Sequence, residues 1–143
     1  MARQRRWLPL LALLPLAAAS CSKRDDLNPV QGQVLYRDQP LAGALVSLHT
    51  AGVTDLKADP PIGLTKEDGT FSLTTGQRPG ARAGQYIVTV LCSEPVKPSS
   101  RNISTAPVET QDRLQGAYAV AETSRIRVEI KPGPNQLEPF RLK

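Results

Sequence analysis

Few side chains in this 143-residue sequence could do acid–base or covalent chemistry, and they are widely spaced. His49 is the only histidine. As a general base or metal ligand it would need a carboxylate, a cysteine or a second histidine beside it, and no such neighbour stands near it in the sequence. The alternation of the surrounding strand places it beside Ser47 on the solvent side. We therefore expect no catalytic site, no metal, no cofactor and no enzyme activity.

Two further groups of residues could bind ions. Lys66-Glu67-Asp68-Gly69 offers at most two carboxylates, whereas calcium takes about six to eight oxygen ligands, so a plain turn is expected there. Arg78 and Arg82 lie in a loop and could hold an anion. An exposed pair of this kind is more often only solvated, and that alternative is favoured.

Cys21 is the cysteine with the clearest chemistry, and the segment before it has three distinct parts. Arg3, Arg5 and Arg6 precede an apolar run, which ends in small residues at 17–20. This order is typical of a secretory signal peptide. The apolar run is shorter than the roughly 20 residues that a helix needs to span a bilayer.

The segment Ala18-Ala19-Ser20-Cys21 resembles a bacterial lipobox. The resemblance implies that residues 1–20 are a lipoprotein signal peptide and that Cys21 is the lipidation site. Residues 21–28 are then a polar tether. Ordinary secretion, with cleavage after Ala17-Ala18-Ala19, and an uncleaved anchor remain the alternatives. Two or three acyl chains would hold the protein on a membrane almost permanently.

Charge argues against nucleic acid as a partner. Of the 18 Lys and Arg residues, three lie in the leader, so 15 remain against 13 Asp and Glu residues, a net charge of +2. The basic residues are interspersed with acidic ones, and aromatic residues are few. A nucleic-acid surface would show clustered basic residues instead.

The remaining residues predict an all-β domain, because apolar residues recur at every second position between Gly- and Pro-rich turns. Segments 30–36, 46–48, 71–73, 86–90, 126–130 and 140–142 show this pattern. Asp68-Gly69 and Arg37-Asp38-Gln39-Pro40 are the expected turns. The strands at 71–73 and 86–90 are expected to form the inner wall of the domain.

The order of these pieces resembles the carboxypeptidase regulatory-like domains, which are prealbumin-like (transthyretin-like) β-sandwiches found in many small bacterial lipoproteins. The motifs that carry it are Val30-x-Gly32-x-Val34, the stretch 39–46, Thr65-x-x-Asp68-Gly69-x-Phe71-x-Leu73 and the stretch 83–90. The resemblance implies an antiparallel prealbumin-like or Ig-like sandwich of about seven strands over residues 29–143. It also implies a non-catalytic role.

Two features lie outside the regular pattern. Cys92 continues the inward parity of the preceding strand, so a buried thiol is favoured over a reactive one. Residues 93–111 are rich in Pro, Ser and Thr and lack periodicity, which predicts a long loop and a candidate binding segment. Asn102-Ile103-Ser104 within it fits a glycosylation sequon, which a bacterial lipoprotein would not normally use.

The sequence thus predicts a lipid-anchored, extracytoplasmic β-sandwich in the cell envelope, with a structural or protein-interaction role. Its expected partners are the membrane, through Cys21, and an envelope protein or glycan. A carbohydrate- or peptidoglycan-binding module is the alternative. The aromatic residues follow inward parity, however, and sugar sites usually expose them.

Overall fold

The computed structural model describes residues 26–52, 59–96 and 109–143. None of these residues belongs to a helix, so no described segment could cross a bilayer as an apolar helix. They form 15 strands: β1 (Leu27–Asn28), β2 (Val30–Tyr36), β3 (Gln39–Pro40), β4 (Leu45–Thr50), β5 (Ile62–Leu64), β6 (Thr70–Ser72), β7 (Thr74–Thr75), β8 (Arg78–Pro79), β9 (Ala81–Arg82), β10 (Gly84–Leu91), β11 (Ser93–Pro95), β12 (Thr110–Asp112), β13 (Arg127–Ile130), β14 (Asn135–Gln136) and β15 (Phe140–Leu142).

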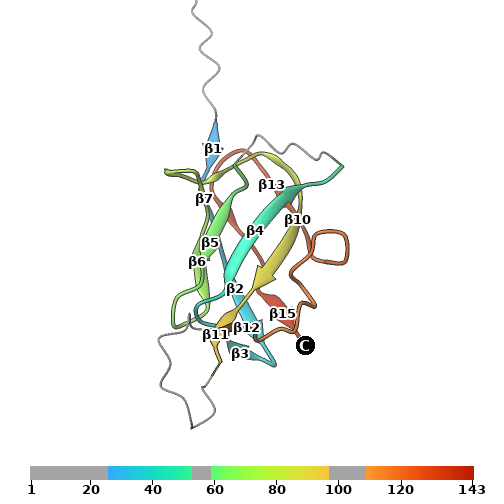
Figure 1. Cartoon of the computed structure of the whole chain (residues 1–143). Helices are drawn as coiled ribbons and strands as arrows, with labels where there is room; N and C mark the ends of the chain where they lie inside the picture. The colour runs from blue at the N-terminus through green and yellow to red at the C-terminus, as the bar shows by residue number, and fades with distance from the viewer. Residues whose placement is uncertain (1–25, 53–58, 97–108) are drawn as a thin grey trace, which may run out of the picture.

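Two sheets account for most of these strands (Figure 1). The first has six strands in the order β13-β10-β4-β5-β7-β8, all antiparallel. The second has five strands gathered around β2, which pairs with β3, β6, β14 and β15. Within the two sheets, seven strands have three or more residues, which agrees with the predicted number: β2, β4, β5, β6, β10, β13 and β15.

The core lies between the sheets and takes side chains from both. Val46 and Val88 come from the first sheet, Val34 and Phe140 from the second, and all four are buried. The Phe71 and Phe140 rings stack with their centroids 5.9 Å apart. The fold is therefore all-β and consistent with a β-sandwich, as predicted.

The pairing differs from the prediction in two respects. Strands β14 and β15 run parallel to β2, so the second sheet is mixed rather than antiparallel. Strands β6 and β10 belong to different sheets, so the segments expected to form one inner wall come from the two opposite layers. Alternation in a sequence specifies which side chains are buried, but it does not specify the neighbours of a strand.

The predicted turn at 37–40 is tighter than expected. Arg37 and Asp38 alone form it, with φ angles of 51° and 63°, and Gln39 and Pro40 already pair with β2. Positive φ at both central residues is the geometry of a two-residue hairpin turn whose twist matches the flanking strands. The Asp38 carboxylate accepts a hydrogen bond from Arg141 at 2.9 Å.

The ordered domain begins before the predicted boundary at residue 29. Leu27 and Asn28, assigned to the tether on sequence, form β1 and pair with β9. The buried Asn28 side chain donates to the Ala81 carbonyl at 3.3 Å and accepts from the Gly133 amide at 2.7 Å. These bonds connect β1, β9 and the turn at Gly133, which are far apart in the sequence. No apolar pattern in the sequence predicts them.

Candidate functional site

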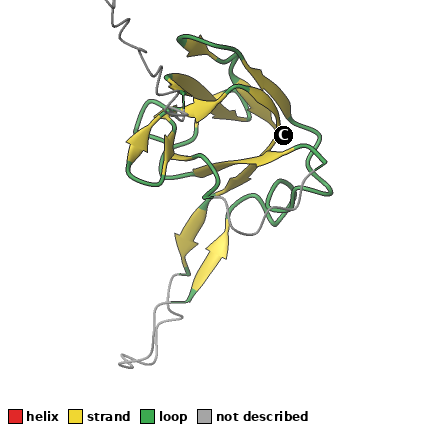
Figure 2. Cartoon of the chain, turned by 90° about the horizontal axis from the view of Figure 1, so that it is seen from above, coloured by secondary structure: helices red, strands yellow, loops and turns green. Residues whose placement is uncertain are grey.

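The most distinctive surface feature is a two-stranded ribbon made by β11 and β12, which stands away from the sandwich (Figure 2). The prediction of an irregular loop over 93–111 is therefore wrong at both of its ends. Every residue of β11 is exposed, and β12 is almost as open. The sequence analysis missed these two strands because neither has a buried face, so apolar and polar residues do not alternate along them. Residues 97–108 lie outside the described residues, and so does the sequon at Asn102.

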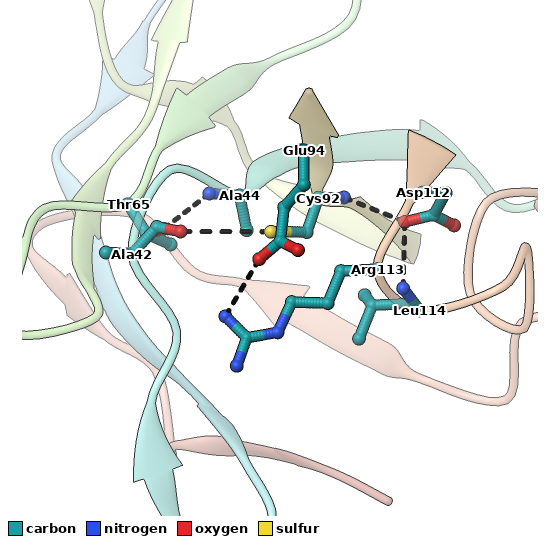
Figure 3. A network of polar contacts seen from close by, with 8 residues as sticks. All are labelled: Ala42, Ala44, Thr65, Cys92, Glu94, Asp112, Arg113 and Leu114. Atoms are coloured by element: carbon teal, nitrogen blue, oxygen red, sulfur yellow. Dashed lines mark hydrogen bonds and ion pairs between the residues drawn. The ribbon is translucent and has the colours of Figure 1, made fainter. Parts of the chain in front are cut away.

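The ribbon joins the sandwich through the carboxylate of Asp112 (Figure 3). One oxygen, Oδ1, accepts from the backbone amides of Cys92 and Leu114, both at 3.1 Å, and Oδ2 accepts from the Gly116 amide at 2.7 Å. Hydrogen bonds to an ionised acceptor are roughly twice as strong as neutral ones. The carboxylate thus fixes the end of β10 and the turn after β12 in one arrangement.

Arg113, the residue after this carboxylate, adds two further contacts to the base of the ribbon. Its guanidinium forms an ion pair with Glu94 at 3.2 Å and lies 5.7 Å from the centre of the Tyr36 ring. The Arg113 amide donates to the Cys92 carbonyl at 2.7 Å. Both charged side chains are about half exposed, so the pair orients the ribbon but contributes little to stability.

Cys92 is buried at the junction between β10 and β11, as predicted from its parity. Its thiol lies 3.8 Å from the Ala42 carbonyl. Burial raises the pKa of the Cys92 thiol, and the nearby Glu94 carboxylate acts in the same direction. A neutral, covered thiol is a poor nucleophile, so its role here is packing.

His49 lies on the outer face of the first sheet, beside Ser47, as the alternation predicts. It is half-buried, and its Nε2 lies within hydrogen-bond distance of Thr89 Oγ1, at 3.0 Å. Within the described ranges, no three His, Cys, Asp or Glu side chains gather as a metal site would require. Among those residues, the hydrogen-bond partner that the structure gives the His49 ring is the Thr89 hydroxyl.

In the turn at 66–69, the Asp68 carboxylate forms hydrogen bonds with Thr70, the residue that follows the turn. Asp68 Oδ1 accepts from the Thr70 hydroxyl at 2.6 Å and from the Thr70 amide at 2.9 Å. These bonds, the hydroxyl first, lower the pKa of the Asp68 carboxyl. Gly69 has a φ of 75° and approaches the Val34 carbonyl so closely that a Cβ would lie 2.5 Å from its oxygen. This is the plain, glycine-dependent turn that was predicted.

The remaining candidate residues are placed as follows. Arg78 and Arg82 are exposed on β8 and β9, close to β1. Cys21, the predicted lipidation site, lies outside the described residues, together with the whole leader at 1–20. The predicted anchor is thus not part of the described structure.

One shallow hollow of about 260 Å³ opens where β10 begins and β13 ends. Its lining includes three polar residues, Gln85, Arg127 and Glu129, and one aromatic residue, Tyr86. Tyr86 is 7% exposed, and its hydroxyl donates to the Arg82 carbonyl at 3.0 Å. Burial also raises the pKa of Tyr86. The ring has no free face on which a sugar could stack.

The ribbon base is the part of this site that sequence reasoning missed. Asp112, Arg113 and Glu94 stand in a polar stretch with no periodic signal. An Asp that precedes a glycine-containing turn is the one local hint, because aspartate often accepts from backbone amides a few residues ahead.

Comparisons with known proteins found weak structural likenesses. No protein-family model matches the chain, and no curated protein matches it. A solved DUF3823 family protein from Parabacteroides merdae has a TM-score of 0.37 and 20% identity, covering 78% of this chain and 43% of that one. A 9R-lipoxygenase from Cyanothece has a TM-score of 0.43 and 16% identity, covering 82% of this chain and 16% of that one.

This chain therefore spans less than half of the first protein and about a sixth of the second. Likenesses of this strength leave family and activity to the arguments from the chain's own residues. Those residues define the class as an all-β domain with a sandwich core and a projecting ribbon.

Proposed function

We propose that this chain is a non-catalytic, lipid-anchored module of the cell envelope, which contacts other proteins through the β11–β12 ribbon. The observation that carries the proposal is the ribbon itself, which is exposed on both strands yet fixed at its base by the Asp112 carboxylate. A chain that has only to remain folded gains nothing from a solvated ribbon. Exposed elements held by a rigid scaffold are where binding functions concentrate.

The position of the ribbon supports the same proposal. Strand β1, where the described chain begins, and the ribbon lie at opposite ends of the sandwich (Figure 1). A lipid on Cys21 would hold the β1 end next to the membrane, because the few residues between them span about 3.5 Å each at most. The ribbon would then point away from the bilayer.

The finer family assignment is part of this proposal. The segments that resemble carboxypeptidase regulatory-like domains fall on β2, on the 66–69 turn with β6, and on β10. These are the elements that supply much of the core. This placement supports a carboxypeptidase regulatory-like domain with an accessory, non-enzymatic role.

Two measurements test the proposal in the cells that make the protein. Metabolic labelling with a palmitate analogue should mark the wild type and leave Cys21→Ala unmarked. A photo-crosslinking residue at Gln111, on the ribbon, should give a discrete adduct that the same residue at Glu129, exposed on the sandwich, does not. An unlabelled wild type would remove the anchor, and equal adducts at both positions would remove the ribbon as the contact.

A further inference from the structure

An apolar row crosses the outer face of the first sheet at its ribbon end. Leu45 is paired with Leu91 on one side and with Leu64 on the other, so the three leucines stand abreast on adjacent strands. Their neighbours in sequence, Val46 and Val90, point into the core, so the leucines point outward. Ile62, two residues before Leu64 on β5, lies on the same face. We call these four residues the leucine row.

The leucine row is the main apolar area on the described surface. Leu64 is 63% exposed, and the other three are 37–39% exposed. Only two other large apolar residues among the described ones are comparably open, Val96 and Val120. Farther along the same face lie Ser47 and His49 on β4, with Ile87 and the buried Thr89 beside them on β10.

An open strand edge adjoins the leucine row. The amides of Val88, Val90 and Val96 donate toward Ile126, Tyr118 and Glu109, all on the side away from β4. Ser93 and Pro95, by alternation, direct their backbone groups to the β4 side. Strand β4 begins at Leu45, opposite Leu91, so it stops short of them. Among the described strands, β11 pairs with β12 alone.

The size of the leucine row limits what can cover it. Its exposed parts amount to roughly 300 Å², near the lower end for the largest patch on an ordinary monomer. A second copy of the chain would need about 800 Å² on each partner for a standard interface. A lipid surface is disfavoured as well, since the leucine row adjoins the ribbon, at the far end from β1.

We propose that the leucine row and the open edge of β11 together bind one extended segment of a partner protein, with aliphatic side chains at every second position. The Ser93 amide and the Ser93 and Pro95 carbonyls bind its backbone, and the leucine row receives its side chains. This is strand addition at a sheet edge, in which the backbone gives affinity and alternate side chains give specificity. The inference rests on the proposed interaction role and identifies the surface and the chemical class of the partner.

The test uses the protein purified from the membranes of the cells that make it, held in nanodiscs, and a phage-displayed library of random twelve-residue peptides. Selected peptides should show aliphatic residues at alternate positions. Leu64→Thr should weaken the best peptide about tenfold or more, because burying a leucine side chain contributes more than one tenfold step in affinity. Leu45→Thr should act in the same direction. Val120→Thr, at another exposed apolar residue outside the leucine row, should leave binding unchanged.

Threonine suits strands, so these variants should keep the wild-type circular dichroism spectrum and melting temperature. Peptides without the alternate pattern, or equal binding by Leu64→Thr and Val120→Thr, would overturn the inference. If sedimentation shows a dimer and Leu64→Thr abolishes it, the leucine row binds a second copy of the chain, and the inference is overturned. An apolar signal from a dye on Leu64→Cys without peptide would assign it to lipid.

Failure of this inference is distinguishable from failure of the proposed function. The Cys21 labelling and the Gln111 adduct do not involve the leucine row. If both persist while the peptide selection fails, the module still contacts partners through its ribbon, and only the extended-segment partner is withdrawn.

Discussion

The sandwich and the ribbon are both built from β-strands, yet different forces hold them. In the sandwich, 17 of the described residues are apolar, buried and joined in one cluster shared by the two sheets. In the ribbon, β11 has no buried residue, and the contacts that fix it are the polar ones around Asp112 and Arg113. A strand pair without a core is marginal in water by itself. The sandwich is thus held mainly by apolar burial, whereas the ribbon is positioned by backbone pairing and by the polar contacts of two residues at its base.

The largest effect is expected from a core substitution. Phe71 is 1% exposed and stacks on Phe140. Phe71→Ala should lower the free energy of unfolding by about 3–5 kcal/mol, because it removes buried contacts and leaves a cavity. Urea denaturation of the purified protein measures this loss. Val120→Ala, at an exposed position, should change stability by less than about 0.5 kcal/mol. Similar losses for the two variants would contradict the assignment of the core.

A smaller and more local effect is expected at the ribbon base. Asp112→Ala leaves the Cys92, Leu114 and Gly116 amides without their acceptor, at a cost of about 1–3 kcal/mol. Hydrogen exchange at these amides and along β11 should speed up strongly, while core amides of β10 change little. Asp112→Asn keeps one side-chain oxygen as an acceptor, so its exchange rates should lie between those of the wild type and those of Asp112→Ala. Uniform acceleration throughout the protein would show that the ribbon and the sandwich open as one unit.

The smallest effect concerns the junction residue Cys92 and depends on pH. Its folded-state pKa is raised by burial, so the fold keeps its full stability below the ordinary thiol pKa. The stability that comes from keeping the Cys92 thiol neutral is lost as the pH rises through its raised folded-state pKa. Denaturation curves of wild type and Cys92→Ala should therefore converge as the pH increases into the alkaline range. In the folded wild type, a thiol reagent should react slowly at neutral pH. Rapid labelling would place the thiol in solvent.

Residues with a buried face were predictable from the sequence. Phe71, Ile130 and Leu142 each stand between two polar neighbours in the sequence, and each is buried in the structure. The Asp68-Gly69 turn was equally clear, because glycine is the residue that accepts its positive φ without strain. Cys92 and His49 also followed from parity. Local patterning therefore recovered the fold class and the orientation of most side chains.

The remainder depends on contacts between distant segments. The parallel pairing of β15 with β2 and the role of Asn28 as a buried link leave no periodic trace in the sequence. The ribbon was missed for a related reason, because exposed strands have no apolar alternation. The leucine row was visible only as apolar residues on both faces of β4 and β10, and its alignment across strands needs the register.

The pairing of β2 with β15 also has a consequence for biogenesis. A ribosome makes Val30 more than a hundred residues before Phe140, so β2 cannot form this parallel pairing until residues 140–142 have been made. Contacts this distant in sequence slow folding. A nascent chain that still lacks β15 therefore cannot complete its second sheet, and the apolar face of β2 stays partly uncovered until that strand is made.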